Sequence, residues 1–283
     1  MNSIMTKITE NNDNNDSNDN NVSNVSNVSN VSNDNPEKSE TDSGVNVPVK
    51  PITLNISERF SKNPVNTQLF FLERKIVKDK SESNVSNLCF DDCNISDCTL
   101  GIITLVSILP NLKRLSFKKC TTDVGSDSMN DILIAIGMIA KCCENLKAIA
   151  LNDTHITDIA VCELANHFPN LEWVSLDRCS KITNNGVIYL CKECKNLKVL
   201  VLRDTRVTNF LIPSLAMDNL EIIDVTGSKI TEIGLQYFIR KHMNKKLRKI
   251  YYTNKSKLPK GSRGSLEWIM KDEFPKFNIK LIS

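Results

Sequence analysis

The amino-acid sequence predicts an α/β solenoid, with a parallel β-sheet on the concave face and helices on the convex face. The first observation is a repeat, because the pair Asn-Leu begins at Asn111, Asn145, Asn170, Asn196 and Asn219. The second is a short apolar alternation after each pair, and the third is a stretch with helical spacing. A strand and a helix in about 25 residues cannot cover their own apolar faces, whereas stacked copies can. We therefore expect about seven units between Asn84 and the C-terminus.

The strand of each unit is predicted from alternation with a period of two. In the unit that begins at Asn170, the apolar residues Leu171, Val174 and Leu176 alternate with Trp173 and other residues. Because successive side chains of a strand point to opposite faces, one set is predicted in the core and the other on the concave face.

The helix of each unit is predicted to follow a residue with a hydroxyl group. This residue comes after Ile or Val in five units, at Ser96, Thr157, Thr183, Thr208 and Thr231. A hydroxyl oxygen at such a place can accept a hydrogen bond from a free backbone N–H of the first turn, so these residues are predicted to be helix N-caps. Helical spacing then predicts two buried faces, formed by Ile159, Cys162, Leu164, Ala165 and Phe168, and by Val187, Leu190, Cys191 and Cys194.

Composition divides the chain into three parts. Residues 1–47 are rich in Asn, Ser and Asp and are predicted to be a disordered tail, although Asn-rich tracts can also drive self-association. Residues 48–83 hold one predicted helix, Thr67–Lys78, and are expected to cap the first repeat. Residues 84–283 are the predicted solenoid, with a degenerate C-terminal cap. The longest unit is expected to place its extra residues in a loop at Thr121–Asn130, either a tolerated insertion or part of a binding rim.

Charge is unevenly distributed along the chain. The formal net charge is +3, yet residues 1–50 hold three basic and eight acidic side chains, which leaves +8 on the remainder. The segment Arg240–Lys280 alone carries 13 Lys and Arg against three acidic residues. A basic end of this kind can meet nucleic acid or an acidic protein, and it can equally be an ordinary solvated surface.

The sequence also predicts the compartment and the redox state. No secretory signal opens the chain and no run of apolar residues is long enough to cross a membrane, so the protein is expected to be intracellular, in the cytoplasm or the nucleus. Ten cysteines in such a chain are expected to be free thiols.

The repeat resembles the cysteine-containing subclass of leucine-rich repeats. The resemblance rests on Cys93, Cys120 and Cys179 after the predicted strands, on Cys143 and Cys194 before Asn-Leu, and on the pair Thr157-Asp158. The resemblance covers about 190 residues. In three units the cysteine after the predicted strand is replaced, by Thr154, Thr205 and Ser228. This subclass occurs in F-box ubiquitin-ligase adaptors and in related mitotic-exit and excision-repair proteins. The resemblance implies the recognition half of such an adaptor, and no F-box is recognisable before the repeats.

The sequence predicts no catalytic, cofactor or metal site. Cys191 and Cys194 have the Cys-x-x-Cys spacing of a zinc site, but the repeat places both on a buried helix face and no second such pair follows at the distance of a zinc finger. His155, His167 and His242 have no partners for a triad in the repeat register, and no glycine-rich phosphate loop is present. The chain is therefore not expected to be an enzyme.

A partner is expected on the concave face of the sheet. Its middle is predicted to be apolar and edged by charge, and the candidate binding residues are Ala148, Ala150, Trp173, Asp177, Val199, Val201, Arg203 and Ile222. A contiguous apolar patch with a central Trp is typical of an interaction site. Two other interpretations remain, since Val, Ile and Trp favour strands whatever their exposure, and the N-terminal tail could cover the patch.

Three functions follow from these observations. The first is a protein-interaction module, expected to be a substrate-recognition component for ubiquitin ligation with ligase subunits among its partners. The second is a scaffold or regulator unrelated to ubiquitin. The third is a repair protein associated with nucleic acid, which the late basic cluster would favour.

Overall fold

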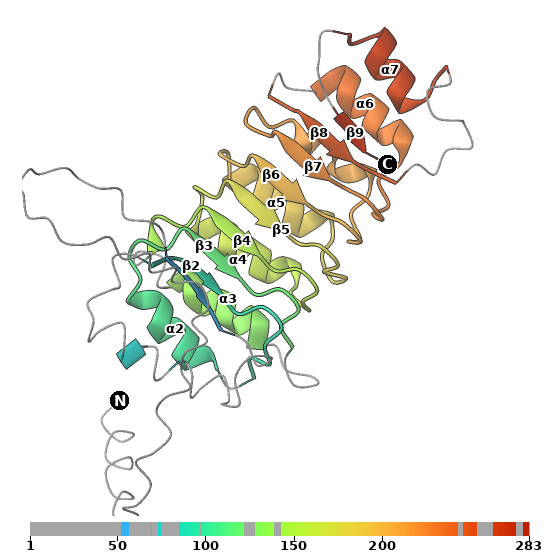
Figure 1. The fold of residues 1–283 in the computed structure, drawn as a ribbon. Coiled ribbons are helices and arrows are strands. Elements are labelled where there is room, and N and C mark those ends of the chain that lie inside the picture. The colour runs from blue at the N-terminus through green and yellow to red at the C-terminus, as the bar shows by residue number, and fades with distance from the viewer. Residues whose placement is uncertain are drawn as a thin grey trace, which may run out of the picture.

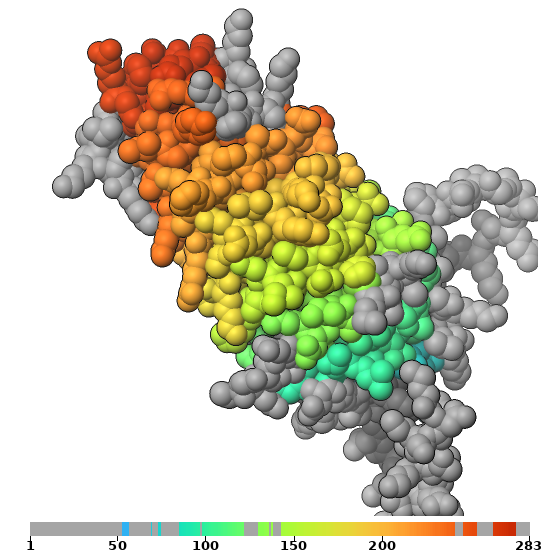
Figure 2. All heavy atoms as spheres, turned by 180° about the vertical axis from the view of Figure 1, so that it is seen from behind, coloured from blue at the N-terminus to red at the C-terminus, as the bar shows by residue number. Residues whose placement is uncertain are grey.

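The computed structural model describes residues 52–56, 69, 73–74, 85–96, 98–121, 128–138, 143–242, 246–253, 263–275 and 280–282. The strands form one nine-stranded parallel sheet in sequence order, and the helices pack on one side of it (Figure 1). Successive units appear as successive bands along an elongated body (Figure 2), as a solenoid requires. The fold is therefore the predicted α/β solenoid. The predicted tail, residues 1–47, lies outside the described residues.

The strands are short and evenly spaced along the chain. They are β1 (Ile52–Asn55), β2 (Val85–Cys89), β3 (Arg114–Ser116), β4 (Ala148–Ala150), β5 (Trp173–Ser175), β6 (Val199–Val201), β7 (Ile222–Asp224), β8 (Lys249–Tyr251) and β9 (Lys280–Ile282). The helices are α2 (Thr99–Ser107), α3 (Ser128–Met138), α4 (Asp158–His167), α5 (Asn184–Glu193), the 3-10 helix η5 (Asn209–Leu215), α6 (Glu232–His242) and α7 (Leu266–Asp272). Among the described residues, no helix is long and apolar enough to span a membrane.

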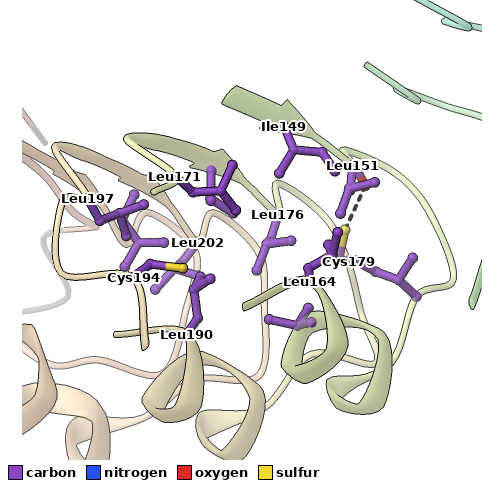
Figure 3. Packing of buried hydrophobic residues seen from close by; sticks show 14 of the residues in the cluster. Ile149, Leu151, Leu164, Leu171, Leu176, Cys179, Leu190, Cys194, Leu197 and Leu202 are labelled. Carbon is purple, nitrogen blue, oxygen red and sulfur yellow. Dashed lines mark hydrogen bonds between the residues drawn. The ribbon is translucent and has the colours of Figure 1, made fainter. Parts of the chain in front are cut away.

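The core lies between the sheet and the helices. The middle residues of the strands pair across the sheet, as Ile149 pairs with Val174 and Val174 with Leu200, and these side chains are buried. The leucines before and after the strands, including Leu171, Leu176, Leu197 and Leu202, also lie in this layer (Figure 3). The predicted core positions of the strands are thus confirmed, whereas some of the residues predicted on the other face, such as Ala150 and Ser175, are also buried.

The N-terminal segment contributes a strand that was not predicted. β1 pairs in parallel with β2, so it forms one edge of the sheet. Within the predicted helix Thr67–Lys78, only Leu69, Glu73 and Arg74 are described, and all three are helical. Leu69 is buried against α2, where a Cβ on Gly101 would lie 3.0 Å from its Cδ1 atom.

Two predictions about the helices were wrong in detail. Ile159 is exposed, because it is the second residue of α4 and lies beyond the edge of the core. The N-cap prediction is wrong at Ser96, since the N-cap residue of α2 is Cys98, and the side chain of Thr157 makes no capping hydrogen bond to its own helix. It is confirmed at Thr183, Thr208 and Thr231, whose hydroxyl oxygens accept hydrogen bonds from backbone N–H groups of the first turn. The predicted loop Thr121–Asn130 is also shorter than expected, since α3 begins at Ser128, and residues 122–127 are outside the described ranges.

The hydroxyl residues also join one unit to the next. The side chain of Asp158 accepts hydrogen bonds from the backbone N–H and the hydroxyl group of Thr183. Asn184 Oδ1 accepts from the N–H of Thr208 at 2.8 Å, and Asn184 Nδ2 donates to its Oγ1 at 2.9 Å. Buried or half-buried polar groups are satisfied in this way between helices whose first turns would otherwise have free donors. We call these contacts the Asx–Thr ladder.

The cysteines after the strands also connect neighbouring units. The thiol of Cys179 donates a hydrogen bond to the carbonyl oxygen of Leu151 in the preceding unit at 2.9 Å (Figure 3). The thiol of Cys120 likewise donates to the carbonyl oxygen of Phe90 at 2.9 Å. Thr205, which has a shorter side chain at this position, forms its hydrogen bond within its own unit. Its Oγ1 hydroxyl donates to the carbonyl oxygen of Leu202 at 2.7 Å. Cysteine therefore fits this place because it is apolar enough for the core and long enough to reach the neighbour.

Candidate functional site

Three rows of side chains run across the strands on the concave face, which we define as the sheet face turned away from the helices. Strand pairing places the first row in register as Arg114, Ala148, Trp173, Val199, Ile222 and Lys249. The second row, two residues later, is Ser116, Ala150, Ser175, Val201, Asp224 and Tyr251. Backbone hydrogen bonds align a third row after the strands, Lys118, Asn152, Asp177, Arg203 and Thr226.

Exposure divides the predicted binding residues into two groups. Trp173, Val199, Val201 and Ile222 are half-buried, so each keeps accessible apolar surface. Ala148 and Ala150 are only 7% and 3% exposed, because small side chains between larger neighbours are covered by them. The apolar patch is therefore narrower than the sequence predicts. Its accessible part consists of these four larger side chains on β5, β6 and β7, and we call it the Trp173 patch.

Asp177 lies beside the Trp173 patch in an unusual environment. Its side chain is 16% exposed, and its Oδ2 atom is 3.9 Å from the guanidinium of Arg178. Its Oδ1 atom is buried without a hydrogen-bond partner, as is Oδ1 of Asn152, its neighbour in the third row. Burial raises the pKa of Asp177 above its ordinary value, although Arg178 and Arg203 oppose this effect. A carboxylate that is partly desolvated and incompletely paired is a feature of binding surfaces more than of structural ones.

Replacing Asp177 with Asn is expected to stabilise the fold by about 1 kcal/mol at neutral pH, because it removes a partly desolvated negative charge and keeps the shape of the side chain. Because burial raises the folded-state pKa of Asp177, the cost of the carboxylate is fully present above that pKa. It is lost as the pH falls through the folded value towards the unfolded one. The gain should therefore disappear on acidification, which urea unfolding of both proteins over a pH series would measure.

The control for this prediction is Asp204→Asn. The side chain of Asp204 is 50% exposed, so its substitution is expected to change the free energy of unfolding by less than about 0.5 kcal/mol. A destabilised Asp177→Asn protein at neutral pH would show that the charged form of Asp177 stabilises the fold.

One edge of the concave face is a row of alternating charges. The carboxylate of Glu172 accepts hydrogen bonds from Lys147 Nζ at 2.8 Å and from Lys198 Nζ at 2.5 Å. Both hydrogen bonds hold the pKa of Glu172 below its ordinary value. Further along, Arg248 lies 3.8 Å from Glu221. These pairs connect neighbouring units at a polar rim, where exposed ion pairs add little stability.

The cysteines and histidines are not arranged for chemistry in the described part of the chain. Burial raises the pKa of Cys191 and of Cys194 to about 12, so neither thiol is a ready thiolate at neutral pH. His155 is exposed, and His167 Nε2 lies 3.6 Å from the Glu163 carboxylate across one turn of α4. No group of three or more metal-ligating side chains occurs among the described residues.

Two hollows of the described surface lie away from the Trp173 patch. One of about 550 Å³ opens between α5 and η5 and is lined by Ile188, Cys191, Lys192, Lys195 and Met217, among others. Another, of about 530 Å³, lies where α4 ends and is lined by Asn145, His167 and Asn170, among others. Both are open to solvent. The concave face of the sheet therefore remains the candidate binding site.

Comparison with curated proteins finds relatives that share part of their length with this chain. The chain is 24% identical over 184 residues to BTB/POZ domain-containing protein FBL11 of Arabidopsis thaliana, which covers 64% of this chain and 18% of that protein. It is 48% identical over 42 residues to antagonist of mitotic exit network protein 1 of Candida albicans, which covers 15% of this chain and 6% of that protein. The chain thus spans less than a fifth of either relative. No family model matches.

Solved structures with some likeness include an internalin C2 from Listeria monocytogenes, with a TM-score of 0.38 and 17% identity over 60% of this chain and 62% of that one. The yeast complex of Rad7 and Elc1 gives a TM-score of 0.27 and 13% identity over 69% of this chain and 87% of that one. Likenesses this weak add nothing to the fold assignment, which rests on the strand register and the burial pattern described above.

Proposed function

We propose that this chain, a leucine-rich-repeat protein of the cysteine-containing subclass, is an interaction module that binds a protein partner on the concave face. The observation that supports this proposal is the Trp173 patch, which offers accessible apolar side chains from three neighbouring strands beside Asp177 and Arg203. An aromatic side chain surrounded by aliphatic ones and edged by charge has the composition of an interface centre. The parallel sheet holds these side chains in place before a partner arrives, which limits the entropy lost on binding.

The finer proposal is that the module recognises a substrate for ubiquitin ligation. It is supported by the resemblance of the repeat to that of F-box adaptors and by the partial similarity to the two curated relatives. In this proposal the concave face holds the substrate, and ligase subunits bind elsewhere. A scaffold unrelated to ubiquitin would use the same concave face without a ligase.

The experiment is affinity purification of the full chain from its own cells, followed by quantitative mass spectrometry, with the wild type and Trp173→Asp compared. Because a central hot-spot residue contributes about 2 kcal/mol or more, the substitution is expected to reduce recovery of the concave-face partner at least tenfold. Under the ubiquitin proposal, a cullin or its small adaptor is recovered equally with both proteins.

The matched control is Leu100→Asp, which introduces the same charge at an exposed apolar residue on α2. This protein is expected to retain every partner of the wild type. Equal recovery of all partners by Trp173→Asp, with unchanged thermal unfolding, would remove the concave face from the proposal. Recovery of a concave-face partner without any ligase subunit would favour the scaffold function unrelated to ubiquitin.

The nucleic-acid function is less well supported by the contacts of the late basic residues. Arg240 is held by Glu273 through two hydrogen bonds, of 2.9 and 2.7 Å, and Arg248 lies near Glu221. Lys246 donates a hydrogen bond to Asn219 Oδ1 at 2.6 Å. Basic side chains engaged in this way are poorer phosphate ligands than free ones, so steep salt dependence of DNA binding would be needed to revive this function.

A further inference from the structure

Large apolar side chains are exposed at the rim where the helices begin. The second residue of α2, α4, η5 and α6 is in each case a large apolar one, respectively Leu100, Ile159, Phe210 and Ile233. Phe210 is 83% exposed and Ile233 is 76% exposed, and the other two are similarly uncovered. A single exposed apolar residue needs no explanation. Here, however, the residue recurs at one position of the repeat, and Phe210 and Ile233 belong to neighbouring units.

The backbone that carries Phe210 and Ile233 is held firmly by the Asx–Thr ladder. Asn209 Oδ1 accepts from the N–H of Thr231 at 2.9 Å, and Asn209 Nδ2 donates to its hydroxyl oxygen at 3.0 Å. Thr208 Oγ1 in turn accepts from the N–H of Phe210 at 3.3 Å. The two apolar side chains are therefore presented from fixed helix starts, so a partner would not have to order this backbone.

A row of basic side chains follows the same rim. Lys181, Arg206 and Lys229 each lie two residues before the hydroxyl residue of their unit, and all three are exposed. The N–H of Arg206 donates to the Ile182 carbonyl oxygen at 3.0 Å, and that of Lys229 donates to the Val207 carbonyl oxygen at 2.9 Å. The three residues thus come from successive units stacked on one another.

These cations are not neutralised by the described part of the protein. The ion pairs of neighbouring units involve other basic residues, such as Arg178 with Asp153 and Arg203 with Asp204. Within the described ranges, Lys181, Arg206 and Lys229 have no carboxylate oxygen within 4.0 Å of a side-chain nitrogen. Three positive charges and two exposed apolar side chains therefore share one stretch of the rim.

We propose that this stretch, the Phe210 rim, is a second docking surface and that it binds an acidic protein segment that also carries apolar side chains. The rim consists of Lys181, Arg206, Lys229, Phe210 and Ile233. Carboxylates of the segment complement the basic row, and its apolar side chains cover Phe210 and Ile233. A protein segment fits better than a nucleic acid, because only Phe210 of the two apolar side chains offers an aromatic surface on which a base can stack, whereas apolar side chains of a protein pack on both.

The Phe210 rim is independent of the concave face. The turns that contain Arg178, Asp204 and Gly227 lie between the strands and the rim in each unit. A partner on the Trp173 patch and an acidic segment on the rim would therefore contact different side chains. The proposal stands or falls separately from the proposed function.

The experiment selects peptides from a random 12-residue display library on the immobilised full chain. Enriched peptides are then synthesised with a fluorescent label and titrated by anisotropy. The expected peptides carry at least two Asp or Glu and at least one large apolar residue. Phe210→Ser and the double substitution Lys181→Glu with Lys229→Glu are each expected to weaken their binding at least tenfold, and Ile233→Ser is a second apolar test.

Two controls isolate the Phe210 rim. Leu100→Ser removes an equally exposed apolar residue from the same helix position, in a unit whose corresponding rim residue is Asn94 and not a cation. Trp173→Asp alters the concave face. Both are expected to bind the peptides within twofold of the wild type. Failure to enrich acidic–apolar peptides, or equal binding by Phe210→Ser, would overturn the proposal. Tighter binding of a 12-nucleotide single-stranded DNA with the same variant dependence would assign the rim to nucleic acid instead.

Discussion

Replacing Val174 with Asp is expected to prevent the chain from folding, with a loss of more than about 4 kcal/mol. Val174 is 2% exposed and lies in the middle row of the sheet between Ile149 and Leu200. An ionised carboxylate there would have neither water nor a partner charge, and such burial is among the most destabilising of single changes. Far-UV circular dichroism and urea unfolding of the purified protein would measure the effect.

The neighbouring residue provides the control for this prediction. Trp173 is adjacent in sequence, but its side chain lies on the concave face and is half-buried, so Trp173→Asp is expected to fold with a free energy of unfolding within about 1.5 kcal/mol of the wild type. The contrast between two successive residues tests the alternation directly. A folded Val174→Asp protein with near-normal stability would mean that the middle row does not face a packed core.

Phe117→Ala is expected to destabilise the fold by about 3–5 kcal/mol. Phe117 and Phe90 are fully buried and stack with ring centroids 5.1 Å apart and planes 6° from parallel. The substitution removes this stacking and leaves a cavity, because the strands on both sides hold their positions through the sheet hydrogen bonds. Guanidinium unfolding, followed by circular dichroism, would give the free energy.

Two further variants distinguish the causes of that loss. Leu151 and Leu176 occupy the position of Phe117 in later units, so Phe117→Leu restores the common residue of the repeat and is expected to lose less than about 1.5 kcal/mol. Phe210→Ala truncates an exposed ring and is expected to change stability by less than about 0.5 kcal/mol. If Phe117→Ala were no worse than Phe117→Leu, the ring stack would not be part of a tightly packed core.

The candidate site was partly predictable from the sequence. Alternation placed Trp173, Val199, Val201 and Ile222 on the concave face, and the strand register confirms that they lie on neighbouring strands. It could not show that Ala148 and Ala150 are covered, because exposure depends on the sizes of neighbours from other units. Nor did it anticipate the environment of Asp177, whose burial arises from residues far apart in the chain.

The Phe210 rim was not predicted, although a signal for part of it is present. A basic residue precedes the Ile/Val-Thr pair at Lys181, Arg206 and Lys229, and comparing units would have revealed that row. The apolar part was harder to see, because helical spacing placed Ile159 in the core. Spacing describes a face of a helix, but it does not show where the core ends along the helix axis.

The sequence by itself determined the repeat, the direction of the strand side chains from β3 to β8 and the burial of the repeated leucines and cysteines. These features follow from local periodicity, since hydrophobic burial acts in the same way on each unit. Only the tertiary structure decided which surface side chains remain accessible, that β1 extends the sheet, and that Asx and Thr side chains connect the helix starts. Each of these depends on the distance between different units, which local periodicity does not contain.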